Sequence, residues 1–157
     1  MSFWDSSALF PLAVTEPTTS RMRAIQQQHE ALFVWWGAFV ECWSALERKT
    51  RDGRLTTEQR RLTELKLHSL ARIWTEIHPT RPLRDRAVRL LAVHDLRAAD
   101  ALQLAAALTW VEERPRGHAF VCLDDRLREA ARREGFLVLP EEASQYPSFS
   151  LDHDSVR

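Results

Sequence analysis

Glycine and cysteine are scarce in this chain, and each scarcity argues against a class of function. The four glycines form neither a GxGxxG motif nor a phosphate-binding loop, so a nucleotide cofactor is not expected. The two cysteines, Cys42 and Cys122, belong to no CxxC pair, which excludes a zinc knuckle and a thioredoxin-like motif. We expect both to be reduced, buried side chains. The six histidines include no HExxH and no pair spaced as zinc ligands.

The chain also lacks an excess of charge and any long apolar run. Its 22 basic and 22 acidic residues cancel at pH 7, whereas a protein that coats nucleic acid non-specifically is usually strongly basic. Binding of nucleic acid would therefore need a local basic surface or a partner. No stretch approaches the roughly 18 consecutive apolar residues of a membrane span, and the first residues lack the basic segment of a signal peptide. We expect a cytoplasmic protein without membrane contacts.

Short apolar runs alternate with longer amphipathic stretches, a pattern typical of an α/β domain with a parallel sheet. Strands are predicted at residues 2–5, 31–36, 74–78, 119–123 and 136–139. Helices are predicted around residues 8–12 and at 17–29, 38–51, 56–73, 82–93, 97–112 and 126–133. The fourth of these helices is expected to carry Leu62, Leu65, Leu70 and Ile73 on one side. The chain is interpreted as one domain, residues 1–140, and a tail, residues 141–157.

Four carboxylates fall where the geometry of a parallel sheet would gather them. Asp5 ends the first predicted strand, and Asp124 follows the fourth. Glu41 and Asp100 lie near the starts of two predicted helices. The carboxyl ends of parallel strands and the starts of the following helices point to the same edge, where sites form. Asp100 is the least ordinary of the four, because it shares a helix side with apolar residues that should face inward.

Each acid also has a purely structural explanation. Asp5 could cap the helix that follows it, as could Asp124 or Asp125. Glu41 and Asp100 could simply favour the positive end of a helix. Together, however, like charges ~4 Å apart repel by about 4 kcal/mol at an effective dielectric near 20. Their joint placement therefore implies raised pKa values or a bound cation, for which Mg²⁺, with Mn²⁺ as a substitute, is the natural choice.

Four segments around these acids follow one another in a recognisable order. They are Asp5-Ser6-Ser7-Ala8-Leu9, Val40-Glu41-Cys42-Trp43-Ser44-Ala45-Leu46, the stretch 94–107 around Asp100, and Leu123-Asp124-Asp125-Arg126-Leu127 with the later Gly135. The set resembles the motifs of PIN-domain proteins, especially the toxin half of VapBC-type toxin–antitoxin pairs. The stretch 94–107 is the most specific part, and the match runs over roughly residues 1–140. Spacing to Leu127 favours Asp124 over Asp125 as the family acid.

The resemblance implies a three-layer α/β/α sandwich with a central parallel sheet, Mg²⁺-dependent cleavage of RNA, a homodimer and a cognate antitoxin. On this basis Asp5, Asp100 and Asp124 are assigned as direct metal ligands. All four acids are assigned as catalytic, with Glu41 acting through water, and the products would carry a 5′-phosphate and a 3′-hydroxyl. Two features depart from the family. Cys122 stands where many relatives have Thr or Ser, and the tail with Asp152-His153-Asp154 has no counterpart.

Alternative hypotheses stay open at this stage. A PIN-like interaction module without catalysis would keep the fold and the dimer, and a PIN-type nuclease acting on DNA would keep the chemistry. His94 is interpreted as a loop or capping residue. Four tryptophans are interpreted as core or dimer interface rather than as base-stacking platforms: Trp35, Trp36, Trp43 and Trp74. Five arginines are interpreted as a solvated helix face rather than an RNA-binding row: Arg81, Arg84, Arg86, Arg89 and Arg97.

Overall fold

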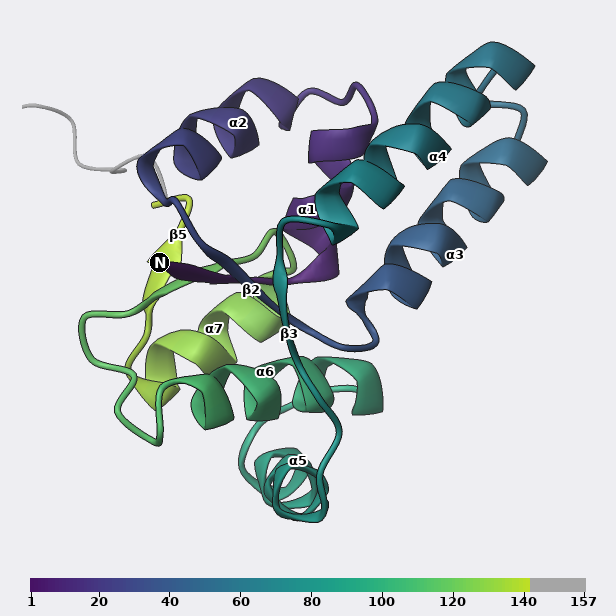
Figure 1. Cartoon of the computed structure of the whole chain (residues 1–157). Coiled ribbons are helices and arrows are strands. Elements are labelled where there is room, and N and C mark those ends of the chain that lie inside the picture. The colour runs from purple at the N-terminus through teal and green to yellow at the C-terminus, as the bar shows by residue number, and fades with distance from the viewer. Residues whose placement is uncertain (142–157) are drawn as a thin grey trace, which may run out of the picture.

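A five-stranded sheet with helices on both faces forms the body of the molecule (Figure 1). The computed structural model describes residues 1–141, so the predicted Asp152-His153-Asp154 cluster and nearly all of the predicted tail lie outside it. All strands are parallel, in the order β3-β2-β1-β4-β5. Their bounds are β1 Ser2–Trp4, β2 Leu32–Trp35, β3 Thr75–Ile77, β4 Ala119–Val121 and β5 Leu137–Leu139. The predicted α/β fold with a central parallel sheet is confirmed.

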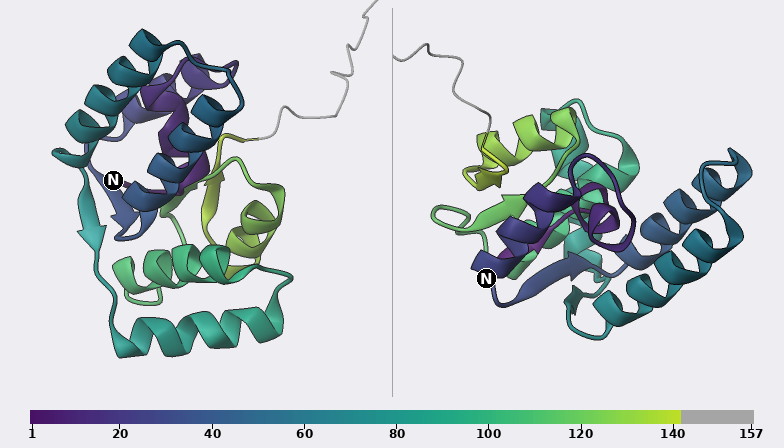
Figure 2. Two further views of the ribbon diagram at one scale, coloured as in Figure 1. Left: turned by 90° about the vertical axis from the view of Figure 1, so that its right-hand side faces the viewer. Right: turned by 90° about the horizontal axis from the view of Figure 1, so that it is seen from above.

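Seven helices cover the two faces of this sheet among the described residues. One face carries α1 (Ser6–Ala13), α2 (Thr19–Gln28), α3 (Ala38–Arg51) and α4 (Thr57–Ala71). The other face carries α6 (Ala98–Trp110) and α7 (Asp125–Glu134), and α5 (Arg81–Val93) packs on the outside of α6 (Figures 1 and 2). The result is the predicted three-layer sandwich, with each element within a few residues of its predicted bounds.

Alternation along the central strands divides the core into two parts. Successive side chains of a strand point to opposite faces. Phe3 and Phe120 accordingly lie in the core under α6 and α7, where their rings stack with centroids 5.5 Å apart. Trp4 and Val121 lie in the core under α1, α3 and α4. Both central strands are therefore buried on both faces, as expected for a parallel sheet with helices on each side.

Helix α4 buries a different side from the predicted one. Leu62, Leu65 and Ile73 are exposed, and the buried positions are Thr63, Leu67 and Leu70. The prediction of one apolar side made of Leu62, Leu65, Leu70 and Ile73 was therefore wrong for all but Leu70. Burial of Thr63 is possible because its hydroxyl donates to the carbonyl of Gln59, 2.8 Å away, so no polar group is left unpaired.

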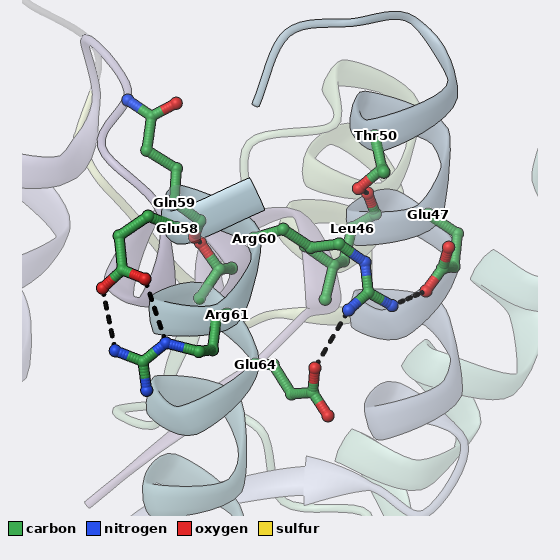
Figure 3. A network of polar contacts seen from close by, with 9 residues as sticks. Leu46, Glu47, Thr50, Glu58, Gln59, Arg60, Arg61 and Glu64 are labelled. Atoms are coloured by element: carbon green, nitrogen blue, oxygen red, sulfur yellow. Dashed lines mark hydrogen bonds and ion pairs between the residues drawn. The ribbon is translucent and has the colours of Figure 1, made fainter. Parts of the chain in front are cut away.

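Helices α3 and α4 lie side by side and project beyond the sheet (Figures 1 and 2). Arg60 of α4 ties them together, because its guanidinium donates to Glu47 of α3 at 2.6 Å and to Glu64 of α4 at 3.0 Å (Figure 3). One-third of the side-chain surface of Arg60 is exposed, 32%, so each pair contributes only modestly to stability. Shared between two partners, the guanidinium nevertheless fixes the outer part of α3 against α4.

Candidate active site

The strand order creates a switch point between β1 and β4. The chain runs from β1 to β2 on one side of the sheet and reaches β4 on the other side of β1, and ligands of open α/β sheets bind at such points. Asp5 directly follows β1, and Asp124 follows β4. The backbone N–H of Asp5 donates to the carbonyl of Val121 at 2.9 Å, which holds the two strand ends together.

Asp5 is a buried carboxylate with two roles. Its Oδ2 accepts from the N–H of Ser7 at 3.0 Å, so Asp5 caps α1, as the sequence analysis allowed. Only 4% of the residue is exposed, and this burial raises the pKa of Asp5 from 3.8 to about 6. Hydrogen bonding from Ser7 opposes the rise, whereas the charges of Glu41 and Asp100 add to it. Asp5 therefore caps a helix and also lies within electrostatic reach of two other predicted acids.

Glu41 is held by side chains from two other helices. Its Oε2 accepts from the hydroxyl of Ser6 on α1 at 2.7 Å and from the side-chain amide of Gln103 on α6 at 3.1 Å. Gln103 is 1% exposed. Sequence reasoning assigned no role to Ser6 or Gln103. A signal for Gln103 was present, since it is the polar residue in the otherwise apolar run that follows Asp100 on α6.

Asp100 lies half-buried at the start of α6. Burial raises the pKa of its carboxyl, and the charge of Asp124 raises it further. The N–H of Arg97, which donates to Oδ2 at 3.3 Å, and the charges of Arg97 and Arg126 oppose the rise. Arg126 lies on α7, so the sequence of α6 gives no sign of this positive neighbour of Asp100. Apolar residues on the same side of α6 are buried as expected, and Ala101 and Leu104 are fully buried.

Asp124 is the exposed member of the set. Its Oδ1 accepts from the N–H of Leu127 at 2.9 Å and so caps α7. The charge of Asp124 contributes to the raised pKa of Asp100. The next residue, Asp125, lines a separate hollow together with Arg21 and Arg128. The structure thus brings Asp5, Glu41, Asp100 and Asp124 into one electrostatically coupled group.

Cys122 lies inside this group rather than beside it. Its Sγ is 3.7 Å from Oδ2 of Asp5 and 3.7 Å from Oγ of Ser7, and it accepts from the N–H of Asp124 at 3.3 Å. Burial, with the charge of Asp5 next in size, raises the pKa of this thiol well above its usual value. Cys122 therefore acts as a neutral hydrogen-bonding group at the position where many of the PIN-domain proteins that the sequence resembles have Thr or Ser. Cys42 is also buried and unpaired, as expected for both thiols.

The chemistry of these oxygen donors fits a hard divalent cation, but their placement is no preformed cage. Within residues 1–141, no three His, Cys, Asp or Glu side chains converge closely enough to enclose a metal ion. Mg²⁺ rarely needs such a cage, because it keeps several waters and takes one or two carboxylates together with a substrate phosphate. Burial is the largest cause of the raised pKa values of Asp5 and Asp100, and the charges of neighbouring acids add to it; a bound cation would favour the ionised forms of both carboxyls.

No protein-family model matches this sequence, and no curated protein sequence matches it significantly. Among solved structures, the chain is similar to the Mycobacterium tuberculosis toxin VapC20, described as cleaving the sarcin–ricin loop. The TM-score is 0.63 at 16% identity, over 87% of this chain and 97% of that chain. This chain has a VapC-like fold. At this level of identity, the similarity establishes the fold alone.

A cavity of about 570 Å³ adjoins the acids of this VapC-like fold. Ser6, Ser7, Glu41 and Ala99 line it at the acidic group. From there it follows α3 outward, past small side chains, to Arg48. Of the four acids, only Glu41 lines this cavity, so a ligand in the cavity reaches the acidic group at Glu41.

Residues outside the acidic group largely have structural roles. His94 ends α5, as its capping interpretation had it, and its Nε2 lies 2.6 Å from Oε1 of Glu134 on α7. Trp35 and Trp74 are buried, whereas Trp36 is 50% exposed. The predicted arginine row of α5 is mostly exposed. None of the helices in the described part of the chain is long and apolar enough to cross a membrane.

Proposed function

We propose that this protein is a Mg²⁺-dependent endoribonuclease, the toxin of a toxin–antitoxin pair, with Mn²⁺ as a substitute metal. The observation that carries the proposal is the coupling of four carboxylates from four separate elements at the switch point of a VapC-like sheet. The VapC20 toxin with this fold is described as cleaving an RNA loop, which favours RNA over DNA. A homodimer, a cognate antitoxin and a cytoplasmic location belong to the same proposal.

Asp5, Asp100 and Asp124 would hold the metal, together with water and the substrate phosphate. When bound, the metal would activate water and neutralise charge on the phosphate that is attacked. Glu41 would orient the attacking water and accept its proton. The hydrogen bonds from Ser6 and Gln103 to one oxygen of Glu41 fix the carboxylate for this task.

Ser7 links Asp5 to the loop that follows β4. Ser7 donates its backbone N–H to Asp5, and the Ser7 hydroxyl accepts from the N–H of Leu123 at 2.9 Å. Ser7 therefore joins the first residues of α1 to the loop between β4 and α7. Because Asp124 lies in that loop, the contact keeps Asp5 and Asp124 at a fixed relative position.

The test is cleavage of a structured RNA pool by the purified protein, with Mg²⁺ or Mn²⁺ and with EDTA. The Asp100→Asn variant should lose at least about 100-fold of the activity, since even outer-shell partners of a metal are worth 10–100-fold. Asp95→Asn, an exposed acid just before α6, is the matched control and should keep full activity. Circular dichroism and urea unfolding confirm that both variants are folded.

Each outcome separates the candidate functions. A folded, active Asp100→Asn protein would refute the site assignment. Preferential cutting of matched DNA oligomers would support the DNA nuclease instead. A folded wild-type protein that cuts no RNA with either metal would favour the interaction module, although the presence of all four acids argues against that alternative.

A further inference from the structure

We propose that the cavity beside the acids continues into a basic path that binds the backbone of single-stranded RNA next to the scissile phosphate. The path is defined by Arg48, Lys49 and Arg54, with Lys66 beyond them. The inference rests on the proposed function in one respect, namely that the acidic end of the cavity is where cleavage occurs.

The geometry of α3 sets the length of the path. Glu41 and Arg48 are seven residues apart and both line the cavity, so they share one face of the helix. At a rise of 1.5 Å per residue, their backbones are separated by about 10 Å along the axis. Ser44 and Ala45, which lie between them, are small enough to leave the floor of the cavity open. A ligand can therefore contact the acidic end and Arg48 at the same time.

The outer end of the cavity carries three cations, Arg48, Lys49 and Arg54, against two carboxylates, Glu16 and Asp52. At the cavity's outer end, Lys49 is paired with Glu16 at 2.7 Å. Within residues 1–141, Arg48 and Arg54 have no carboxylate at salt-bridge distance, although Asp52 also lines the cavity and offsets one of their charges.

A second, smaller hollow of about 190 Å³ extends the basic end. It shares Lys49 and Arg54 with the first cavity and adds Lys66, and none of its lining residues is acidic. Both lysines of the chain therefore lie along one path. The path leads from a carboxylate group that suits a metal ion to a series of cations that suit phosphates.

This arrangement matches a nucleic-acid strand better than a protein partner. Single strands are bound in basic grooves that follow the phosphate backbone, and guanidinium groups suit phosphate oxygens particularly well. Most side chains that line the first cavity are polar or charged, and Phe10, Ala45 and Ala99 are its apolar ones, whereas the core of a protein interface is usually aromatic or apolar. A chain with zero net charge needs such a local path, because its overall field does not attract RNA.

The path is also held in shape before any ligand arrives. Arg60 of α4 donates to Glu64 of its own helix and to Glu47 of α3, and the contact with Glu47 ties the outer part of α3 to α4 (Figure 3). Glu47 immediately precedes Arg48, so this contact keeps the helix turn that carries Arg48 in place. Less ordering is then needed on binding, which favours affinity.

The test measures the salt dependence of RNA binding. A short fluorescein-labelled oligouridylate is titrated with protein in Mg²⁺, and anisotropy gives the association constant between about 50 and 200 mM salt. All proteins carry Asp100→Asn, and a gel confirms that the RNA stays intact. The double variant Arg48→Ala/Arg54→Ala, which removes two positive charges, is compared with Arg51→Ala, which removes one from the last turn of α3 at a residue that lines neither cavity.

Each phosphate contact on a single strand contributes about 0.7 to the slope of log K against log salt. The double variant should therefore lower the slope by about 1.4 and weaken binding roughly tenfold at the lower salt concentration. Arg51→Ala should leave the slope unchanged. Because the substituted side chains are exposed, all variants are expected to fold, and urea unfolding checks this.

An unchanged slope in the double variant would overturn the proposal, as would an equal decrease with Arg51→Ala. The proposal would also be overturned if the double variant kept the slope for RNA but bound polyglutamate more weakly. That result would assign the path to an acidic polypeptide. The failure of the proposed function looks different. In that case the wild-type protein cuts no RNA, whereas failure of the basic path leaves cleavage intact and the slope unaltered.

Discussion

Replacing Asp5 by asparagine should make the metal-free protein more stable at neutral pH. The folded protein raises the pKa of Asp5 from 3.8 to about 6, mainly by burial. That difference corresponds to about 3 kcal/mol, since a tenfold change in an acid constant is worth 1.36 kcal/mol. Because the ionised form is the disfavoured one, this free energy opposes folding at pH 7. Asparagine removes the charge, keeps nearly the same volume and is an equally good helix cap.

The sign of the pH dependence follows from proton binding. Between about pH 4 and pH 6 the folded protein holds the Asp5 proton more tightly than the unfolded chain does, so stability falls as pH rises through this range. Above about pH 7 the full destabilisation is present, and below about pH 4 it is absent. The advantage of Asp5→Asn should therefore be about 3 kcal/mol near pH 7.5 and close to zero near pH 4.

Urea unfolding in EDTA, followed by tryptophan fluorescence, measures this difference. Trp4, which is fully buried next to Asp5, reports on this part of the core. The control is Asp85→Asn, an acid of α5 whose side chain is 66% exposed and whose replacement should change stability by no more than about 0.5 kcal/mol. If Asp5→Asn were no more stable than wild type near pH 7.5, or gained equally near pH 4, burial would not be the cause of the raised pKa.

Two further predictions concern the groups around the acids. Gln103→Leu should lower kcat of RNA cleavage by about 10–100-fold at unchanged KM, because Glu41 loses one of its two orienting hydrogen bonds. The exposed Gln27→Leu is its control, and a loss expressed in KM alone would contradict a positioning role. Cys42 and Cys122 should resist Ellman's reagent in the native protein and react only in urea, since burial raises the pKa of both thiols. Rapid labelling of either native thiol would refute this.

The fold was predictable because the hydrophobic pattern matches the secondary structure almost everywhere. The central strands β1 and β4, three residues each and buried on both faces, appear in the sequence as short apolar runs. Helix α4 shows where the pattern misleads. Counting leucines favours Leu62 and Leu65, but the side that fits against the neighbouring helices contains Thr63 and Leu67. A buried threonine whose hydroxyl donates to its own helix leaves no trace in a hydropathy pattern.

The four acids were predictable because they follow from the rule that strand ends and helix starts meet at one sheet edge. Their partners were not predictable, because Ser6 and Gln103 reach Glu41 only through the packing of α1 and α6 against α3. The basic path escaped prediction for the same reason. The arginine-rich stretch of the sequence lies in α5, whereas the cations beside the cavity lie on α3, on α4 and in the loop between them.

Capping and metal binding, first treated as competing explanations for the acids, are compatible in this structure. Asp100 uses Oδ2 to accept from Arg97, and Asp124 uses Oδ1 to accept from Leu127. In the described part of the chain, the other oxygen of each carboxylate accepts no hydrogen bond. One oxygen thus fixes the side chain at the positive end of a helix, which offsets part of the repulsion between the acids. The second oxygen stays available to a cation, so the helix caps preorganise the ligands that we propose for the metal.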